Sequence, residues 1–380
     1  MLQQDTAVNT QPYRYRLVEE IERRLSRPLV TSVREAFLSV PRNLFIERYY
    51  EQQGNSFSWD PVPSPSLEAI YRDEPLVTKL DAHGRPVCSS SQPSIMAVQL
   101  EALDLQSGHR VQEIGAGTGY NAALMGHMVG RTGQVISIDI DEELVSTAKL
   151  HLSYTRAGNV LAVSGDGFAG YPANSPYDRL LATCGVKYIP RAWLYQLKQG
   201  GVLICNVLLN LASIFVRLEK LNSTTLEGRL LDIDAQYMEM HSPSGLPSRS
   251  GIHWKKYDAL PRHDAKLSDN LTELLNNTSY SLLLQCVLPR VSKHYRWNAG
   301  KDQPDVYLLE QPSVGAAVRV HDDRITVYGD SEHLEEQIKE SIAMYEHLYP
   351  EAGYKVRITE DQAMITIGDQ SWPFAIIGPE

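Results

Sequence analysis

The sequence predicts an α/β protein with a doubly wound parallel sheet, preceded by a helical segment and followed by a separate C-terminal α+β domain. Between about 109 and 208, strand-like apolar runs alternate with helical segments across short turns. After about 212 this alternation stops, and short strand-like runs accompany one long helix. We therefore expect three parts, with bounds 1–93, 94–212 and 213–380.

In the central part the predicted strands and helices alternate along the chain. Connections of this kind place the strands in parallel, with helices on both faces of the sheet. The expected strands are RVQEIGA (110–116), QVISIDI (134–140), NVLAVSGD (159–166), YDRLLATC (177–184) and VLICNVLL (202–209). The expected helices are 121–129, 141–152 and 189–197.

The flanking parts carry weaker patterns. Apolar residues recur at helical spacing within 14–39, whereas 51–66 is rich in Gly, Ser and Pro and is typical of a loop or flap. Pro93 opens a predicted helix that covers Ser94 to Leu103. In the last part we expect a helix over 331–348 and strands at 213–219, 280–287, 305–310, 315–320, 324–328, 354–359, 362–367 and 371–377.

The composition argues against several classes of protein. The 380 residues carry 36 Lys+Arg against 46 Asp+Glu, which disfavours a nucleic-acid partner bound through a broad basic surface. The four cysteines show no CxxC spacing, so we expect neither a disulfide framework nor a metal site. The N-terminus lacks the apolar stretch of a signal peptide, and no apolar run approaches the ~20 residues that span a bilayer. We therefore expect a cytoplasmic protein without a membrane partner.

A glycine loop follows the first strand of the central part. In EIGAGTGY (113–120) a strand gives way to a helix, and the glycines allow the backbone to turn tightly against a ligand. A glycine-rich turn without a ligand is one alternative. A dinucleotide site is another, but its fingerprint is GxGxxG, whereas the glycines here alternate as GxGxG. This spacing favours an adenosyl amino-acid cofactor, which has no pyrophosphate.

Acidic residues end the next two strands. Asp139 lies about twenty residues beyond the glycine loop, the spacing of an acid that binds both ribose hydroxyls. Asp141 is the candidate cap of the following helix. Asp166 or a neighbouring amide is placed to contact an adenine amino group, with an ordinary Asp-Gly turn as the alternative. Ligands of such sheets bind at this edge, outside the carboxyl ends of the strands.

Three consecutive serines, Ser89 to Ser91, are followed by Gln92 and Pro93 before a predicted helix. Their hydroxyls and the exposed amides of the helix start predict a cradle for a carboxylate. A serine loop that only caps the helix is the alternative, and composition alone favours this simpler interpretation.

Segments along roughly residues 30–210 resemble the protein L-isoaspartyl O-methyltransferase family. They are VPRNLFI (40–46), SSSQP (89–93), EIGAGTGY (113–120), SIDIDEEL (137–144), GDGFAGYP (165–172), PYDRLLAT (176–183) and IPRAWLYQLKQGG (189–201). The resemblance implies a Rossmann-like class I methyltransferase fold, with S-adenosyl-L-methionine as cofactor and S-adenosyl-L-homocysteine as product. Motifs and resemblance together predict cofactor contacts from Glu113, Gly115, Gly117, Gly119, Tyr120, Asn121, Asp139, Ile140, Asp166, Gly167 and Thr183.

The resemblance also implies the methyl acceptor. In this family the serine directly before a Gln-Pro or Ala-Pro pair contacts the substrate carboxylate, and the matching residue is Ser91, the predicted catalytic residue. Ser89, Ser90 and Gln92 are the further predicted substrate contacts, although Ser89-Ser90 replaces the family's usual Thr-Ile. The segments WDP (59–61), YRDEPLVTKL (71–80) and QSWPFAI (370–376) are similar to a branch that modifies ribosomal precursor peptides, in graspetide pathways with ATP-grasp ligases or in lanthipeptide and lasso-peptide pathways.

We therefore expect a carboxyl O-methyltransferase that esterifies an aspartate side chain of an acidic precursor peptide, the ester then closing to an aspartimide. The alternative is repair of isoaspartyl residues in damaged proteins. A carboxylate with a pKa of about 4 is ionised at pH 7, so no general base is required and Ser91 would orient it. The basic, aromatic stretch 290–297 is either a solvated loop or a grip on the acidic peptide. We expect a monomer.

Overall fold

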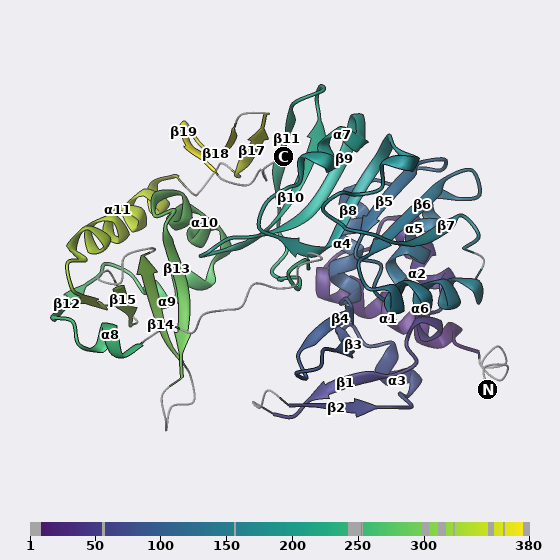
Figure 1. Ribbon diagram of the computed structural model, residues 1–380, viewed down its shortest axis with the longest axis horizontal. Coiled ribbons are helices and arrows are strands. Elements are labelled where there is room, and N and C mark those ends of the chain that lie inside the picture. Colours follow the sequence, from purple (N-terminus) through teal and green to yellow (C-terminus); the bar gives the residue numbers. More distant parts are fainter. Residues whose placement is uncertain are drawn as a thin grey trace.

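The part of the chain that the structure describes forms three β-sheets, of four, ten and five strands (Figure 1). The computed structural model describes residues 9–54, 58–155, 157–241, 252, 254–297, 304–310, 317–321, 324–348, 353–359 and 362–374. The four-stranded sheet lies beside the ten-stranded sheet, and the five-stranded sheet lies with its helices at the far side of the molecule.

The ten-stranded sheet contains the predicted parallel core. Its parallel strands pair in the order β7-β6-β5-β8-β9, as the strand–helix alternation predicts. These strands are β5 (Arg110–Ile114), β6 (Gln134–Asp139), β7 (Val160–Ser164), β8 (Tyr177–Val186) and β9 (Leu197–Leu208). The doubly wound α/β fold is therefore confirmed.

The sheet continues past residue 212 through antiparallel strands. Two of them follow β9 directly, and three come from the end of the chain, so the C-terminal region contributes to the same sheet. They are β10 (Ser213–Lys220), β11 (Leu226–Leu231), β17 (Lys355–Ile358), β18 (Ala363–Ile367) and β19 (Gln370–Pro373).

Helices cover both faces of this sheet. One face packs against α1 (Gln11–Leu25), α2 (Thr31–Ser39), α4 (Pro93–Leu103), α5 (Tyr120–Val129) and α6 (Glu142–Ser153). The other face packs against α7 (Arg191–Gln196) and part of the C-terminal region. Burial of apolar side chains on both faces explains why the central strands are apolar along most of their length.

A small antiparallel sheet covers residues that the sequence predicts to be a loop. Its strands are β1 (Tyr49–Gln52), β2 (Trp59–Val62), β3 (Leu76–Leu80) and β4 (Pro86–Ser90), in the order β2-β1-β3-β4. The loop prediction for 51–66 is therefore wrong over β1 and β2, which pair with each other. Pro61 misled the prediction, but a proline is tolerated on an edge strand such as β2. The short helices η2 (Arg42–Phe45) and α3 (Leu67–Ile70) flank this sheet.

The five-stranded sheet and its helices form the rest of the C-terminal region. The strands are β12 (Arg262–Lys266), β13 (Val291–Arg296), β14 (Asp305–Glu310), β15 (Ala317–Val320) and β16 (Arg324–Tyr328), and they pair in the order β12-β16-β15-β14-β13. The helices are α8 (Trp254–Asp258), α9 (Leu271–Asn276), α10 (Thr278–Val287) and α11 (Glu332–Leu348). The predicted long helix is present as α11.

Two predictions in this region are wrong. The expected strand at 280–287 is helix α10, whose residues from Tyr280 to Cys286 are all buried. A helix buried on every side has a continuous apolar run, which cannot be told from a buried strand by its period. Asn277 carries the missed signal, because its side chain caps α10 by accepting from Ser279 N and Tyr280 N. The stretch 290–297, expected to be a loop, forms β13 over most of its length.

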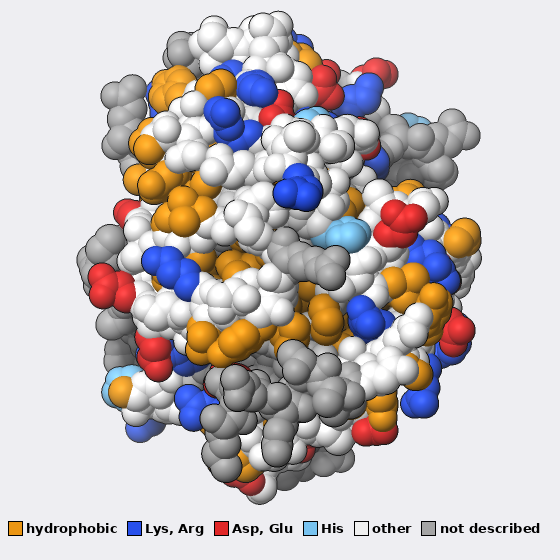
Figure 2. All heavy atoms as spheres, turned by 90° about the vertical axis from the view of Figure 1, so that its right-hand side faces the viewer, with side chains coloured by type: hydrophobic (Ala, Val, Ile, Leu, Met, Phe, Trp, Pro, Cys, Tyr) orange, Lys and Arg blue, Asp and Glu red, His pale blue; other side chains and the backbone are white. Residues whose placement is uncertain are grey.

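The surface beside β6 and β7 shows no concentration of one charge. Figure 2 views this side of the molecule, and the Lys and Arg side chains there are scattered among uncharged and acidic ones. Apolar side chains form several separate groups on the same face. Among the helices that the structure describes, none is both long enough and apolar enough to cross a bilayer.

Candidate active site

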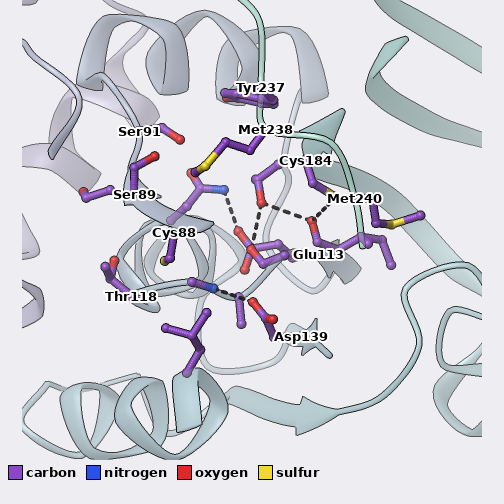
Figure 3. Close-up of a pocket in the computed structure, with 18 of the residues that line it drawn as sticks. Cys88, Ser89, Ser91, Glu113, Thr118, Asp139, Cys184, Tyr237, Met238 and Met240 are labelled. Carbon is purple, nitrogen blue, oxygen red and sulfur yellow. Dashed lines mark hydrogen bonds between the residues drawn. The ribbon is translucent and has the colours of Figure 1, made fainter. Parts of the chain in front are cut away.

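A cavity of about 330 Å³ opens at the carboxyl ends of β4, β5 and β6 (Figure 3). Its wall comes from segments that are distant in the sequence. They include residues 87–92, then Ile95, Met96 and Gln99 of α4, residues 113–118 and 120–121 around the glycine loop, 138–141, Gly167, 183–184, and 235–241 from the C-terminal region. The predicted cofactor motifs and the predicted serine cradle therefore line one cavity.

The glycine loop takes the backbone conformation that its sequence predicts. Gly115, Gly117 and Gly119 have φ angles of 98°, 50° and 84°, in the left-handed region that side chains disfavour. At Gly115 a Cβ atom would also lie 2.6 Å from Thr183 Oγ1. Thr183 donates this hydroxyl to the Gly115 carbonyl at 2.7 Å and so fixes the loop. The loop can therefore approach a ligand closely through its backbone.

Asp139 ends β6 at the cavity wall, next to the glycine loop. Its carboxylate accepts from Gly117 N at 3.0 Å and from Asp141 N at 3.1 Å. Burial raises the pKa of Asp139, although these two amides oppose the shift. Asp141 caps α6 by accepting from Glu143 N and Leu144 N, the role that the sequence assigns to it. Asp139 is thus the acid that faces the cavity and is available to hydroxyl donors.

Glu113 is a buried carboxyl group at the start of the glycine loop. It accepts from Asn121 Nδ2 at 2.7 Å and from Ser137 Oγ at 2.5 Å. Burial raises the pKa of Glu113 to about 7, against the effect of these hydrogen bonds. Asn121 Oδ1 is buried and has no hydrogen-bond partner within the described part of the chain. A buried acceptor without a partner fits a ligand that brings a donor, such as an ammonium group.

Most of the predicted cofactor residues line the cavity, including Tyr120, Ile140 and Gly167. Gly119 and Asp166 do not. Gly119 permits close packing of α6, since a Cβ atom there would lie 3.2 Å from Ala148 Cβ. The Asp166 carboxylate accepts from Phe168 N at 2.9 Å, as in an ordinary Asp-Gly turn.

The serine segment lies beside the glycine loop, since a Cβ atom at Gly117 would lie 3.8 Å from Ser89 O. Ser89 and Ser91 line the cavity and are drawn near one another in Figure 3. Ser90 also lines the cavity but is 3% exposed, and its hydroxyl accepts from Arg42 Nη2 at 3.3 Å. The Ser91 side chain lies near the Tyr237 phenol, which lines the same cavity. Ser89 and Ser91 are therefore the serines best placed for a ligand.

Arg42 holds the serine segment in place from beneath. Its side chain is fully buried, and burial lowers its pKa to about 10, so it stays charged at neutral pH. The guanidinium donates to carbonyls of two separate segments. Its acceptors are Ile70 O and Arg72 O at 2.9 Å, Glu74 O at 3.0 Å, Ser91 O at 3.3 Å and Ser90 O at 3.5 Å. Arg42 belongs to the family-like segment VPRNLFI (40–46), but no role for this arginine was predicted from the sequence.

A buried carboxylate already lies at the start of α4. Asp73 is fully buried and accepts from Ser94 N at 2.7 Å, from Gln92 Nε2 at 3.3 Å and from Arg24 Nε at 2.7 Å. Pro93 has no amide proton to offer. The expectation that exposed amides of this helix start cradle the substrate is therefore wrong for Ser94. Gln92 lines the cavity, but its side chain binds Asp73.

The C-terminal region supplies a cavity wall that the sequence analysis missed. After β11 the chain returns to β8, where Met240 N donates to Gly185 O at 2.7 Å and Gly185 N donates to Met238 O at 2.8 Å. This pairing places Tyr237, Met238 and Met240 around the cavity (Figure 3). The alternating pattern QYMEM is a strand signal, but nothing local to it indicates where the strand pairs.

Among the described residues that line this cavity there is neither lysine nor arginine. The cations of the basic stretch 290–297 each have a partner within the C-terminal region. Arg296 forms two hydrogen bonds with Asp258, Arg290 pairs with Glu310 at 2.9 Å, and Lys293 Nζ donates to a backbone carbonyl at 3.1 Å. Arg290 nevertheless stays 70% exposed, so the binding of an acidic peptide by this stretch stays a prediction.

Comparison with known proteins identifies the family. The family model "Protein-L-isoaspartate(D-aspartate) O-methyltransferase (PCMT)" matches residues 17–237, more than half of the chain. A protein-L-isoaspartate O-methyltransferase of Thermotoga maritima is 38% identical over 180 residues, which are 47% of this chain and 51% of that protein. One of Methanococcus maripaludis is 33% identical over 219 residues, which are 57% of this chain and 92% of that protein.

A solved structure extends the similarity beyond the matched segment. A protein-L-isoaspartate O-methyltransferase structure superposes with a TM-score of 0.56 and 26% identity, and the match covers 93% of this chain and 99% of that one. The sequence match, by contrast, spans about half the length of the Thermotoga maritima relative. The sheet and its helices form the class I methyltransferase fold, and the chain belongs to the protein-L-isoaspartate (D-aspartate) O-methyltransferase family.

Proposed function

We propose that this chain transfers a methyl group from S-adenosyl-L-methionine to a side-chain carboxylate of a protein or peptide, with an isoaspartyl residue as the acceptor. The observation that carries the proposal is the single cavity that joins the glycine loop and Asp139 to Ser91. A methyl donor and an acceptor must meet in one cavity for an in-line displacement, because the reacting atoms have to approach to within about 3–3.5 Å.

The cavity residues fit the cofactor. Asp139 would accept from the ribose hydroxyls, and the backbone of Gly115 and Gly117 would lie against the adenosyl amino acid. Asn121 Oδ1, a buried acceptor without a described partner, would accept from its ammonium group. When bound, this cofactor supplies an electrophilic methyl group on a sulfonium ion.

The acceptor half of the cavity is suited to an anion that needs no proton removed. A carboxylate is already ionised at neutral pH, so the protein's task is orientation and exclusion of water. The Ser91 hydroxyl would donate to one carboxylate oxygen. The described residues that line the cavity include neither lysine nor arginine, so the Arg42 guanidinium would act on the carboxylate only from behind the serine segment.

Isoaspartate is favoured as the acceptor by the relatives. Both curated relatives and the solved structure carry the name protein-L-isoaspartate O-methyltransferase. The solved structure also matches 93% of this chain, so the similarity includes most of the C-terminal region. A region that is shared in this way gives no reason to assign the chain to a dedicated peptide-modifying branch.

An ordinary aspartate of a ribosomal precursor peptide remains the second candidate. It rests on Ser89-Ser90, which stand in place of the family's usual Thr-Ile beside Ser91. Arg290, Lys293 and Arg296 each have a partner within the protein, which weakens the support that a basic stretch would give to an acidic peptide.

A matched pair of peptides tests the proposal. The two peptides have the same sequence and differ only in carrying isoaspartate or aspartate at one position. With labelled S-adenosyl-L-methionine, we expect base-labile methyl ester on the isoaspartyl peptide and little on the other. Ester formation only on the aspartyl peptide, followed by loss of water's mass relative to the starting peptide, would support the second candidate. An enzyme that binds the cofactor but esterifies neither peptide would refute both.

A further inference from the structure

Gln99 is a buried polar side chain of the cavity to which the proposed reaction gives no role. It lies on α4, two turns beyond Ser91, and is 1% exposed. Its amide oxygen accepts from the Tyr237 hydroxyl at 2.5 Å. Its amide nitrogen, Nε2, is buried and makes no hydrogen bond to any residue that the structure describes.

This amide lies in the same cavity as the acceptor serine, and one phenol lies near both. Tyr237 donates its hydroxyl to Gln99, and the Ser91 side chain lies near the same phenol. The three side chains come from α4, from the segment after β11, and from the residue after β4. All three line the cavity, so a ligand in it can meet both the Gln99 amide and the Ser91 hydroxyl. Tyr237 also fixes the orientation of the amide, because it holds the oxygen end.

Packing alone does not account for glutamine at this position. The neighbouring buried positions of α4 hold Met96, Leu100 and Leu103, which need no hydrogen bonds. A buried amide nitrogen without a partner destabilises the fold, and such groups usually have one. A ligand oxygen in the cavity would provide it, whereas a methionine would fill the same volume without that requirement.

We propose that Gln99 is a further substrate-binding residue, whose Nε2 donates to an oxygen of the acceptor carboxylate beside Ser91. The inference rests on the proposed function, which supplies the carboxylate. A carboxylate has about four lone-pair directions, so it accepts from Gln99 and Ser91 and still directs one lone pair at the methyl group. Tyr237 acts through Gln99 and is a positioning residue.

Two substitutions separate a donor from a space-filling residue. Gln99→Met keeps the volume and removes the donor, so kcat/KM for the isoaspartyl peptide should fall about tenfold or more, as expected for a lost hydrogen bond to a charged group. At pH 8, kcat/KM of Gln99→Glu should be lower still, because its carboxylate repels the acceptor carboxylate. Its activity should partly recover as the pH is lowered and this carboxyl gains a proton to donate. A space-filling role gives no such recovery.

Gln112→Met is the matched control. Gln112 is also fully buried and also carries an amide atom without a partner among the described residues, but it lies on β5 outside the cavity wall. We expect a change in melting temperature with an unchanged KM for the peptide. Both Gln99 variants should bind S-adenosyl-L-homocysteine within about twofold of the wild type. Tyr237→Phe should lower turnover less than Gln99→Met does. The double variant should be little worse than Gln99→Met, because Tyr237 acts through Gln99.

The outcomes distinguish this inference from the proposed function. If the wild-type enzyme methylates the peptide and the kcat/KM of Gln99→Met is within twofold of the wild-type value, the role of Gln99 is overturned and the proposed function stands. Equal loss of peptide turnover and cofactor affinity in Gln99→Met also overturns it, because the effect is then structural. Wild-type enzyme that methylates neither peptide overturns the proposed function and this inference together.

Discussion

Replacing Arg42 by lysine tests whether one buried guanidinium holds the acceptor segment. Arg42 is fully buried and donates to carbonyls at Ile70, Arg72 and Glu74 on one side and to the Ser90–Ser91 segment on the other. Lysine keeps the charge, but its compact ammonium has three donors on a single nitrogen. It cannot span both segments as the planar guanidinium does.

The expected loss in the free energy of unfolding follows from the hydrogen bonds that the substitution removes. Three of the contacts are short, at 2.9, 2.9 and 3.0 Å, and the others are 3.3 to 3.5 Å. A hydrogen bond to a charged group contributes about 1.5–3 kcal/mol. If lysine retains one side of the contact set and loses the other, the free energy of unfolding should fall by about 3–5 kcal/mol. This is a large part of the ~5–15 kcal/mol that holds a typical domain folded.

Urea unfolding and methyl transfer measure the two consequences. We expect the lower free energy of unfolding just given, together with a loss of peptide turnover that exceeds the loss of S-adenosyl-L-homocysteine affinity. The turnover falls because the serine segment is displaced, while the glycine loop keeps its own contacts. Arg34→Lys is the control, since Arg34 is exposed and pairs with Glu22 at 3.5 Å, and its effect should stay below about 0.5 kcal/mol. An Arg42→Lys protein within about 1 kcal/mol of the wild type would refute the reasoning.

Three further substitutions test the site. Ser91→Ala should lower peptide turnover about tenfold or more and leave S-adenosyl-L-homocysteine binding intact by calorimetry; unchanged turnover would contradict the acceptor role. Asp139→Ala should weaken cofactor binding about 100-fold, since two hydrogen bonds to a carboxylate are lost, and an unchanged Kd would exclude the ribose contact. Burial raises the pKa of Glu113 to about 7, so the folded protein keeps a proton that the unfolded chain releases near 4.5. Stability should therefore fall by about 3 kcal/mol as the pH rises from 4.5 to 7. Glu113→Gln should remove this slope in urea unfolding, and a slope that persists would show that Glu113 titrates normally.

The central sheet was predictable because its signals are local. Each parallel strand is a short apolar run followed by a turn, and the central strands β5, β6 and β8 bury apolar side chains on both faces of the sheet. Helix α10 was not predictable in the same way, because complete burial removes the apolar period that distinguishes a helix. The β1–β2 hairpin was missed because its glycines, serines and prolines are typical of a loop and its strands are only four residues long.

The residues of the site show the same difference between local and long-range signals. The glycine loop and Asp139 are close in the sequence, and their spacing alone indicated the kind of cofactor. Arg42 acts on Ser90 from 48 positions away, and Tyr237 acts on Gln99 from 138 positions away. No spacing rule connects such residues, because their proximity depends on how the four-stranded sheet and the segment after β11 pack against the central sheet.

The charge of the cavity predicts how the two substrates bind together. The described residues that line it include neither lysine nor arginine, and the Arg42 guanidinium is already bonded to carbonyls behind the serine segment, so the acceptor carboxylate would find its main counter-charge on the bound methyl donor. Two opposite charges about 4 Å apart attract by about 4 kcal/mol at an effective dielectric constant of 20. We therefore expect the isoaspartyl peptide to bind at least tenfold more tightly to the enzyme loaded with a cationic analogue, in which an ammonium replaces the sulfonium, than to the enzyme loaded with neutral S-adenosyl-L-homocysteine. Calorimetry at low and at physiological ionic strength measures both Kd values. Equal affinity in the two complexes would show that the protein, rather than the donor, neutralises the acceptor. The same attraction is lost once the methyl group is transferred, because the ester and the sulfide are both uncharged, and this loss would favour release of the products.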